Sequence, residues 1–375
     1  MAKKKKIKYF FDYSLLFTVM FIAGFGLIVM YSASGYSAQN TMKDAMYFLK
    51  RQALFAACGV VAMLVVSRVD YHIYYKLSRP FYVVSLALQI VTAIIGVASH
   101  GSARWLKIAG VQFQPAELMK IAVIIQLSTL ITINGQKMND MKKMLLTALW
   151  GLGPAVIIAK TNLSTAMIIA GITFFMMWIS CKRVAPFAIA GGFAMMVYVF
   201  AYPFAKLLQK LSILQEYQLV RIFAWKDPSS YADDTFQTLQ GLYAIGSGGI
   251  FGKGLGESVQ KFLMPEAQND MIFTIICEEL GLFGAVSMIL IYAFIIYRMY
   301  DDARNAKDLF GSMLVIGIMC HVALQIIFNI AVATNTIPNT GVTLPFVSYG
   351  GTSLLILMGE MGIALSVSRQ ISLET

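Results

Sequence analysis

GLYAIGSGGIFGKGLGESVQKFLMPEAQNDMIFTIICEELG, residues 241–281, is the stretch around which this chain is organised. Its glycine-rich first part closes a long polar segment that begins near Lys206, and its last part is apolar. Asp270 lies where the two parts meet, and Glu278 and Glu279 lie inside the apolar part. A carboxylate at the mouth of a membrane helix, preceded by a long polar loop, indicates recognition or chemistry at that point.

The composition is that of an integral membrane protein. The 375 residues are 58% hydrophobic and 13% charged, and the mean hydropathy is +0.69. The apolar runs are long and do not alternate with polar residues, which indicates helices rather than a barrel. The net charge of +11 is explained by loop lysines and arginines that face anionic lipid, so we expect no nucleic-acid partner.

The positions of lysine and arginine predict the topology. The opening MAKKKK precedes an apolar run, Leu15 to Tyr31, that is long for the h-region of a signal peptide. Short basic loops follow alternate spans, so we expect both termini in the cytoplasm. At roughly 20 residues per crossing, the apolar runs predict about ten helices. After the first, these lie near 52–67, 80–97, 115–133, 144–159, 162–180, 185–205, 270–297, 309–332 and 343–367.

We therefore predict an all-α integral membrane protein in which residues 1–375 form a single polytopic domain. One large extracellular loop, residues 206–269, separates the seventh and eighth transmembrane helices. Residues 204–223 carry apolar side chains at helical spacing, which predicts an interfacial helix. The stretch AIGSGGIFGKGLGES has six glycines without a preceding strand, so a dinucleotide fold is not expected. Either the glycines form a compact loop or their amides approach a diphosphate.

Charged residues near the membrane mark candidate functional positions. Glu117 and Lys120 are three residues apart at the start of the fourth span, so they share one helix face. They form either a local ion pair or a polar patch that faces an outer cavity. Arg104 and Trp105, just before this span, add a cation and an aromatic surface.

Asp270 has two interpretations as well. It could cap the helix that follows it, or it could act as a general base at the outer membrane surface. Glu266, four residues earlier, could tune or imitate that role, whereas Glu278 and Glu279 are better suited to packing or to a polar relay.

The closing stretch IPNTGVTLPFVSYGGTS interrupts the last apolar pattern with prolines and glycines. Broken helices at this depth are tolerated where they line a cavity or pack on protein. We assign Ser348, Gly350 and Gly351 from this stretch to substrate binding, together with Arg104, Trp105 and Glu266. The cysteines and histidines are scattered, so we predict no disulfide and no metal site from them.

Four stretches together resemble the SEDS family, which comprises the FtsW, RodA and SpoVE proteins. They are SARWLKIAGVQFQPAELMK, GLYAIGSGGIFGKGLGES, MPEAQNDMIFTIICEELG and TGVTLPFVSYGGTS, and they occur in the family's order over nearly the whole chain. With QIIFNIAVATNTIPNTG before it, the last stretch is more similar to the FtsW/SpoVE branch than to RodA.

The resemblance implies a peptidoglycan glycosyltransferase that polymerises lipid II at the outer face of the bacterial plasma membrane. It implies a class B penicillin-binding protein as partner, with other divisome or elongation proteins. The family's essential aspartate corresponds to Asp270, its glutamate and lysine to Glu117 and Lys120, and its Arg-Trp pair to Arg104 and Trp105. The chain departs from the family at KTNLSTA, where Asn162 replaces an acid and Ser164 a glycine.

These assignments predict a mechanism. Asp270 accepts the proton of an acceptor hydroxyl in an inverting displacement, and Lys120 and Arg104 stabilise the leaving diphosphate. Glu117 orients Lys120 or contributes to a site for a divalent cation such as Mg²⁺ or Mn²⁺, although no ligand cluster identifies one and no other cofactor is expected. Two alternatives stay open: a flippase for the same lipid, and a non-catalytic activator of the penicillin-binding protein.

Overall fold

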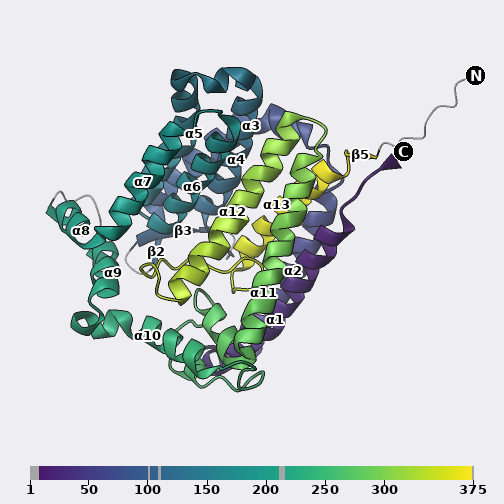
Figure 1. Ribbon diagram of the computed structural model, residues 1–375. Coiled ribbons are helices and arrows are strands. Elements are labelled where there is room, and N and C mark those ends of the chain that lie inside the picture. Colours follow the sequence, from purple (N-terminus) through teal and green to yellow (C-terminus); the bar gives the residue numbers. More distant parts are fainter. Residues whose placement is uncertain (1–7, 100–101, 109–110, 211–215, 374–375) are drawn as a thin grey trace, which may run out of the picture.

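The computed structural model describes residues 8–99, 102–108, 111–210 and 216–373 (Figure 1). Within these ranges, nine helices are long and apolar enough to cross a membrane, and one bent helix pair brings the number to ten. The predicted helical membrane fold is confirmed. The nine helices are α1 (Tyr13–Met42), α2 (Tyr47–Val66), α3 (His72–Ile95), α4 (Pro115–Asn134), α5 (Met141–Ala159), α6 (Leu163–Ser180), α11 (Ile272–Arg304), α12 (Leu309–Ala333) and α13 (Gly351–Ser368).

The bent pair replaces the single seventh span that the sequence predicts. Helix α7 (Ala185–Val199) has 15 residues and α8 (Ala201–Lys210) follows at an angle of 88°. The interfacial helix expected over 204–223 is likewise two helices, α8 and α9 (Glu216–Lys226), and residues 211–215 between them lie outside the described ranges. The bend lets α8 leave the bundle at the start of the segment that follows.

Much of the predicted extracellular loop is helical. After α9 come a 3-10 turn, η2 (Pro228–Tyr231), and then α10 (Ala232–Ser247), while residues 248–271 are irregular apart from η3 (Gln260–Phe262). Helices α8, α9 and α10 lie together at the end of the bundle away from the termini (Figure 1). The last span is shorter than predicted because residues 334–350 form an irregular connection, and α13 begins only at Gly351.

Both chain ends lie at the opposite end of the bundle (Figure 1). Strand β1 (Lys8–Tyr9) pairs antiparallel with β5 (Ser372–Leu373). Asp12 and Arg298 strengthen this end, because the guanidinium Nε lies 3.0 Å from the buried carboxylate. Termini on one side require an even number of crossings, which agrees with counting the bent pair as one span.

A small sheet interrupts the helical pattern before α4. Strands β2 (Val97–Ser99), β3 (Ser102–Ile108) and β4 (Val111–Phe113) pair in that order, all antiparallel. The all-α description therefore holds for the spans but not for this loop. Arg104 and Trp105 lie on β3, and Trp105 pairs with Val97.

Helices α4, α12 and α13 form the centre of the bundle and are more buried than the others. Gly317 of α12 allows α4 to approach closely, because a Cβ there would lie 2.5 Å from a methyl group of Ile124. Small residues serve this purpose in membrane proteins, where helix association depends on close packing. The candidate residues of α4, α11 and α13 are thus supported by a rigid centre.

Candidate functional site

Asp270 lies two residues before α11, at the end of the bundle away from the termini. Helix α11 has Met271 as its N-cap residue, without a side-chain cap, so Asp270 does not serve as the cap. The carboxylate is half-buried, and its Oδ1 lies 3.4 Å from Nε2 of Gln237 on α10. Gln237 in turn accepts a hydrogen bond from Nδ2 of Asn339, at 3.3 Å. Asp270 therefore faces polar side chains of α10 and of the connection 334–350.

Helix α12 fixes the backbone at this position. Asn329 is fully buried, and its amide nitrogen donates 2.8 Å hydrogen bonds to the carbonyls of both Asp270 and Val342. The amide of Tyr349 donates to the carbonyl of Gln268 at 2.9 Å. The connection 334–350 thus helps to hold the start of α11 against the bundle.

Arg221 of α9 brings a cation to the same place. Its Nη1 donates to the carbonyl of Asn339 at 3.2 Å. A Cβ added to Gly341 would lie 3.8 Å from Oδ2 of Asp270 and 3.9 Å from Nη1 of Arg221. Gly341, with φ of 69°, therefore lies close to both the carboxylate and the guanidinium.

A narrow cavity adjoins this group and has a volume of about 20 Å³, which is room for one water molecule. A sugar would need α9 and α10 to move away from the connection 334–350. The cavity is lined by Arg221, Ala224, Trp225, Thr235, Thr238, Leu239, Asn335 and Asn339.

Glu117 and Lys120 form a buried ion pair at the start of α4. The ammonium Nζ lies 2.8 Å from Oε1 of Glu117, and only 1% of the Lys120 side chain is exposed. The other carboxylate oxygen accepts a 3.0 Å hydrogen bond from Ser353 of α13. The local ion pair that the sequence suggested is present, and Lys120 is too buried in this arrangement to contact a substrate.

The three residues assigned from the closing stretch lie between the two groups. Ser348 is buried, and its hydroxyl accepts a hydrogen bond from the amide of Leu344 at 2.7 Å. Gly350 donates its amide to Gln52 of α2 at 3.2 Å. Gly351 is packed against Phe55, whose ring would lie 2.3 Å from an added Cβ. As placed here, all three residues hold the start of α13 in position.

The remaining predicted positions differ in exposure. Glu266 is exposed, has φ of 52° and accepts a 2.7 Å hydrogen bond from the side chain of Asn269. Trp105 is half-buried on β3. The side chain of Arg104 lies outside the described part of the structure, so its predicted role stays a prediction.

The glycine-rich stretch packs against a break in α11. At Gly281 the backbone has φ of 66° and ψ of −166°, which divides α11 into a short outer helix, 272–280, and a long inner one. The amides of Lys253 and Gly254 donate to the carbonyls of Glu278 and Glu279, each at 3.0 Å. In return, the amides of residues 282 and 283 donate to the carbonyls of residues 249 and 250, at 2.9 and 3.0 Å.

We call residues 248–261 the glycine wedge, because they fill this break. Its glycines permit the contact: a Cβ on Gly248 would lie 2.0 Å from the carbonyl oxygen of Cys277, and one on Gly252 would lie 2.2 Å from that of Glu279. The compact-loop interpretation therefore describes these glycines, and the amides of Lys253 and Gly254 are already engaged by α11.

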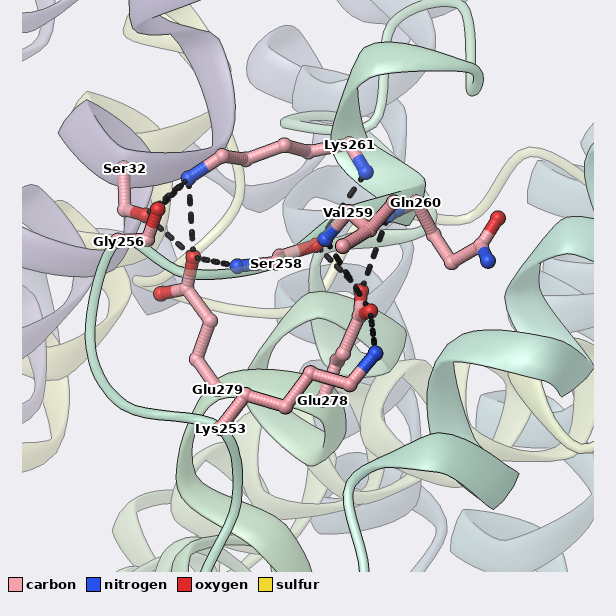
Figure 2. Close-up of polar contacts among 9 residues, drawn as sticks. All are labelled: Ser32, Lys253, Gly256, Ser258, Val259, Gln260, Lys261, Glu278 and Glu279. Carbon is pink, nitrogen blue, oxygen red and sulfur yellow. Dashed lines mark hydrogen bonds and ion pairs between the residues drawn. The ribbon is translucent and has the colours of Figure 1, made fainter.

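Glu278 and Glu279 bind the side chains of the wedge (Figure 2). Glu278 is fully buried and holds the ammonium of Lys253 at 2.7 Å, the hydroxyl of Ser258 and two further backbone amides. Glu279 lies 3.3 Å from Nζ of Lys261 and accepts a 2.5 Å hydrogen bond from Ser32 of α1. The packing role expected for the two glutamates is thus what their contacts indicate.

Further buried polar groups continue along α12. Asn329, Gln325 and His321 recur every four residues and so share one face. Gln325 donates to the carbonyl of Thr343 at 3.1 Å, and Nδ1 of His321 lies 2.7 Å from a carboxylate oxygen of Glu360, with both side chains fully buried. Sequence reasoning missed these residues, although polar residues inside an apolar span were a visible signal.

The departures from the family pattern have structural roles. Asn162 caps α6, because its side-chain oxygen accepts a hydrogen bond from the amide of Thr165 at 3.2 Å. Ser164 donates to the carbonyl of Thr340, beside Gly341. A glycine could not make this bond, so Ser164 connects α6 to the connection that contacts Asp270.

Among the described residues, no three His, Cys, Asp or Glu side chains come together in a way that could hold a metal ion. The divalent cation near Glu117 therefore stays a prediction. A cation bound by Asp270 or by Glu117 would need further ligands, such as the oxygens of a diphosphate.

Proteins of known sequence resemble the chain over nearly its whole length. The family described as "Cell cycle protein", FtsW/RodA/SpoVE, matches residues 13–373. The stage V sporulation protein E of Bacillus subtilis (strain 168) is 34% identical over 367 residues, which cover 96% of this chain and 97% of that protein. The "Probable peptidoglycan glycosyltransferase FtsW" of the same organism is 35% identical over 381 residues, with 97% of this chain and 92% of that protein covered.

Solved structures share the fold. A chain from work described as "Structural coordination of polymerization and crosslinking by a peptidoglycan synthase complex" matches with a TM-score of 0.76 and 22% identity, over 96% of this chain and 98% of that one. The rod shape determining protein RodA of Thermus thermophilus matches with a TM-score of 0.69 and 22% identity, over 96% and 97% of the two chains.

Proposed function

Because this chain belongs to the FtsW/RodA/SpoVE family of cell cycle proteins, we propose that it polymerises lipid II into glycan strands at the outer face of the plasma membrane. The observation that carries this is its similarity, along nearly the full chain, to relatives named peptidoglycan glycosyltransferases. The chain is accordingly a glycosyltransferase of cell wall synthesis. The similarity to FtsW and SpoVE proteins favours their branch, as the closing stretch of the sequence predicted.

The reaction needs the 4-hydroxyl of a GlcNAc on one lipid-linked sugar to attack C1 of the MurNAc on another. We assign Asp270 as the general base that accepts the hydroxyl proton. Its half-buried carboxylate at the outer end of the bundle supports this role, since partial burial keeps it accessible while protein dipoles hold it. A positioned base of this kind contributes about 10²–10⁴ to a rate.

The leaving polyprenyl diphosphate gains negative charge, which a cation must stabilise. Arg221 is the candidate that the contacts support most directly, because both it and Asp270 lie close to Gly341. Lys120 is a second candidate that exchanges Glu117 for the diphosphate, and Arg104 a third. A divalent cation such as Mg²⁺ or Mn²⁺, held by the diphosphate with Glu117, could share this task.

A class B penicillin-binding protein, which crosslinks the glycan product, is the partner that we propose. The structural match to a peptidoglycan synthase complex described as coordinating polymerization and crosslinking supports an assembly of this kind. Both termini are assigned to the cytoplasm, because they lie together at the end opposite Asp270 and the amino terminus is rich in lysine.

The test uses purified protein with its partner and labelled lipid II, and moenomycin silences contaminating classical transferases. Wild-type protein is expected to give glycan strands on a gel, and Asp270→Asn about 10²- to 10⁴-fold less product in the same time. Asp233→Asn, a change of an exposed aspartate on α10, is the matched control and should behave as wild type. Equal product from wild type and Asp270→Asn would remove Asp270 from the chemistry.

Two alternatives make different predictions in the same preparation. A flippase would move fluorescent lipid II across a vesicle bilayer without making polymer, and Asp270→Asn would leave that movement intact. A non-catalytic activator would make no polymer itself, yet both forms would raise the crosslinking rate of the partner.

A further inference from the structure

The short first helix of α11, residues 272–280, connects the position of Asp270 to the contacts of the glycine wedge. Asp270 lies two residues before its start, and Glu278 and Glu279 lie at its end. Nine residues of α-helix are about 13 Å long, so a tilt of about 5° at one end moves the other by about 1 Å. A displacement of about 1 Å from productive geometry can lower a rate by about 10². The contacts of Glu278 and Glu279 therefore bear on the position of Asp270.

The break at Gly281 makes this helix depend on outside support. A continuous helix would be held in line by its own hydrogen bonds to the inner part of α11. At the break, the glycine wedge supplies four backbone hydrogen bonds to the two helix ends instead. The wedge therefore orients helix 272–280 at its Gly281 end, while Asn329 of α12 holds the backbone at the Asp270 end.

The side chains around Glu279 connect the wedge to α1 (Figure 2). Nζ of Lys261 lies 3.3 Å from Oε1 of Glu279, 3.2 Å from Oγ of Ser32 and 2.5 Å from the carbonyl of Gly256. Glu279 is 1% exposed, and the Lys261 side chain is 6% exposed. The ring of Phe262 packs edge-on against Tyr36 of α1, with centroids 4.8 Å apart. Helix 272–280 is thus tied through Glu279 to a long transmembrane helix.

We propose that Lys261, Glu279 and Ser32 are positioning residues that set the orientation of helix 272–280 and thereby place Asp270 for catalysis. This inference rests on the proposed function, in which Asp270 is the base. Because a buried ion pair adds little stability over a neutral pair of similar shape, its removal should impair placement more than folding. The Glu278–Lys253 pair is left intact in the test, because Glu278 is fully buried and would keep an unpaired charge without Lys253.

The test measures kcat and KM for lipid II with the full-length protein and its partner. Glu279→Gln combined with Lys261→Met removes the ion pair without leaving a buried charge. We expect kcat to fall about 10- to 100-fold while KM stays within about twofold. Asp44→Asn combined with Lys50→Met, which removes an exposed ion pair of 2.8 Å at the connection between α1 and α2, is the matched control and should keep kcat within about twofold. Wild-type kcat in the folded double variant, or a changed KM alone, would overturn the inference.

If the double variant does not fold, two further measurements test the inference without it. Ser32→Ala removes only the hydroxyl on Glu279, and we expect a fall in kcat of about threefold with an unchanged melting temperature. Hydrogen exchange of the amides in 264–274 should be faster in this variant than in wild type. Unchanged kcat and unchanged exchange would contradict the inference. Asp270→Asn is assayed in parallel. If it has wild-type activity, the proposed base is wrong. If its activity is lost while the Glu279, Lys261 and Ser32 variants are fully active, only the positioning role is wrong.

Discussion

Gly341 lies close to both the proposed base and Arg221, and its backbone adopts a left-handed conformation. Its φ of 69° costs an alanine about 1–2 kcal/mol, while the space for a Cβ is adequate at 3.8 Å from Asp270. We expect Gly341→Ala to lower the free energy of unfolding by about 1 kcal/mol and to lower kcat several-fold, as the backbone relaxes between the two charged groups. Thermal unfolding in detergent and the polymer assay measure both effects.

Gly359 provides the control for this prediction. It lies within α13, and an added Cβ would meet nothing within 4 Å. Gly359→Ala should leave kcat unchanged and should not lower the melting temperature. Equal effects of the two substitutions would mean that the left-handed backbone at residue 341 has no part in placing the charges.

At the scale of single residues, the sequence predicts Asp270 as a candidate but not the residues that surround it. Asp270, Glu117 and Lys120 stand out because charges are costly beside apolar spans. Gln237, Asn339 and Arg221 come from three separate elements, and only the folded chain brings them to Asp270. The burial of Lys120 was not predictable either, since it depends on packing among α4, α12 and α13.

At the scale of secondary-structure elements, the glycine wedge requires glycine at positions where a Cβ has no room. A Cβ on Gly252 would lie 2.2 Å from the carbonyl oxygen of Glu279, and φ there is 78°. We expect Gly252→Ala to expel the wedge from the break in α11, to lower the melting temperature by at least several degrees and to abolish polymer synthesis. Gly246→Ala, on α10 with nothing within 4 Å of its Cβ, should have little effect. Similar melting temperatures for both variants would contradict the role of the wedge.

Most elements could be predicted because apolar length decides a membrane helix. The exceptions share a physical cause. Helix α11 breaks at Gly281 and α13 starts late at Gly351, since in both places the backbone finds hydrogen-bond partners in other segments. Apolarity along the chain does not report such partners.

At the scale of the whole molecule, a polar cluster of Tyr71, His72 and Asp308 joins the starts of α3 and α12 at the end near the termini. Burial raises the pKa of Asp308, but hydrogen bonds from the Gly311 amide, the Tyr71 hydroxyl and the His72 ring outweigh this and lower it below its ordinary value of 3.8. Because the pKa of Asp308 is lower in the folded state than in the unfolded state, its carboxylate stabilises the fold fully at pH values above the unfolded-state pKa. This stabilisation is lost as the pH falls through the folded-state pKa.

This sign leads to a pH-dependent prediction. At pH 7 we expect Asp308→Asn to lower the free energy of unfolding by about 1 kcal/mol, because it weakens charge-assisted hydrogen bonds. The difference from wild type should narrow as pH falls below 4. Melting temperatures of the two proteins between pH 3 and 7 provide the check, and a gap that widens on acidification would show that the carboxylate is not stabilised in the folded state.

The ten-crossing arrangement predicts which positions face outward. A cysteine in place of Phe251, which is 81% exposed in the wedge, should react with a membrane-impermeant maleimide in intact cells. A cysteine in place of Ser372, on β5, should react only after permeabilisation. Wild-type protein, with its native cysteines, is the control. The reverse pattern would invert the topology that the lysine-rich amino terminus predicts.

The central claim is that Asp270 is the general base, and the pH dependence of kcat for lipid II polymerisation tests it most directly. For wild-type protein we predict an acidic limb in which log kcat rises with unit slope and then reaches a plateau. Asp270→Asn should retain about 10⁻² to 10⁻⁴ of the plateau rate and lose the limb. A variant that keeps the limb, or the wild-type rate, would contradict the account.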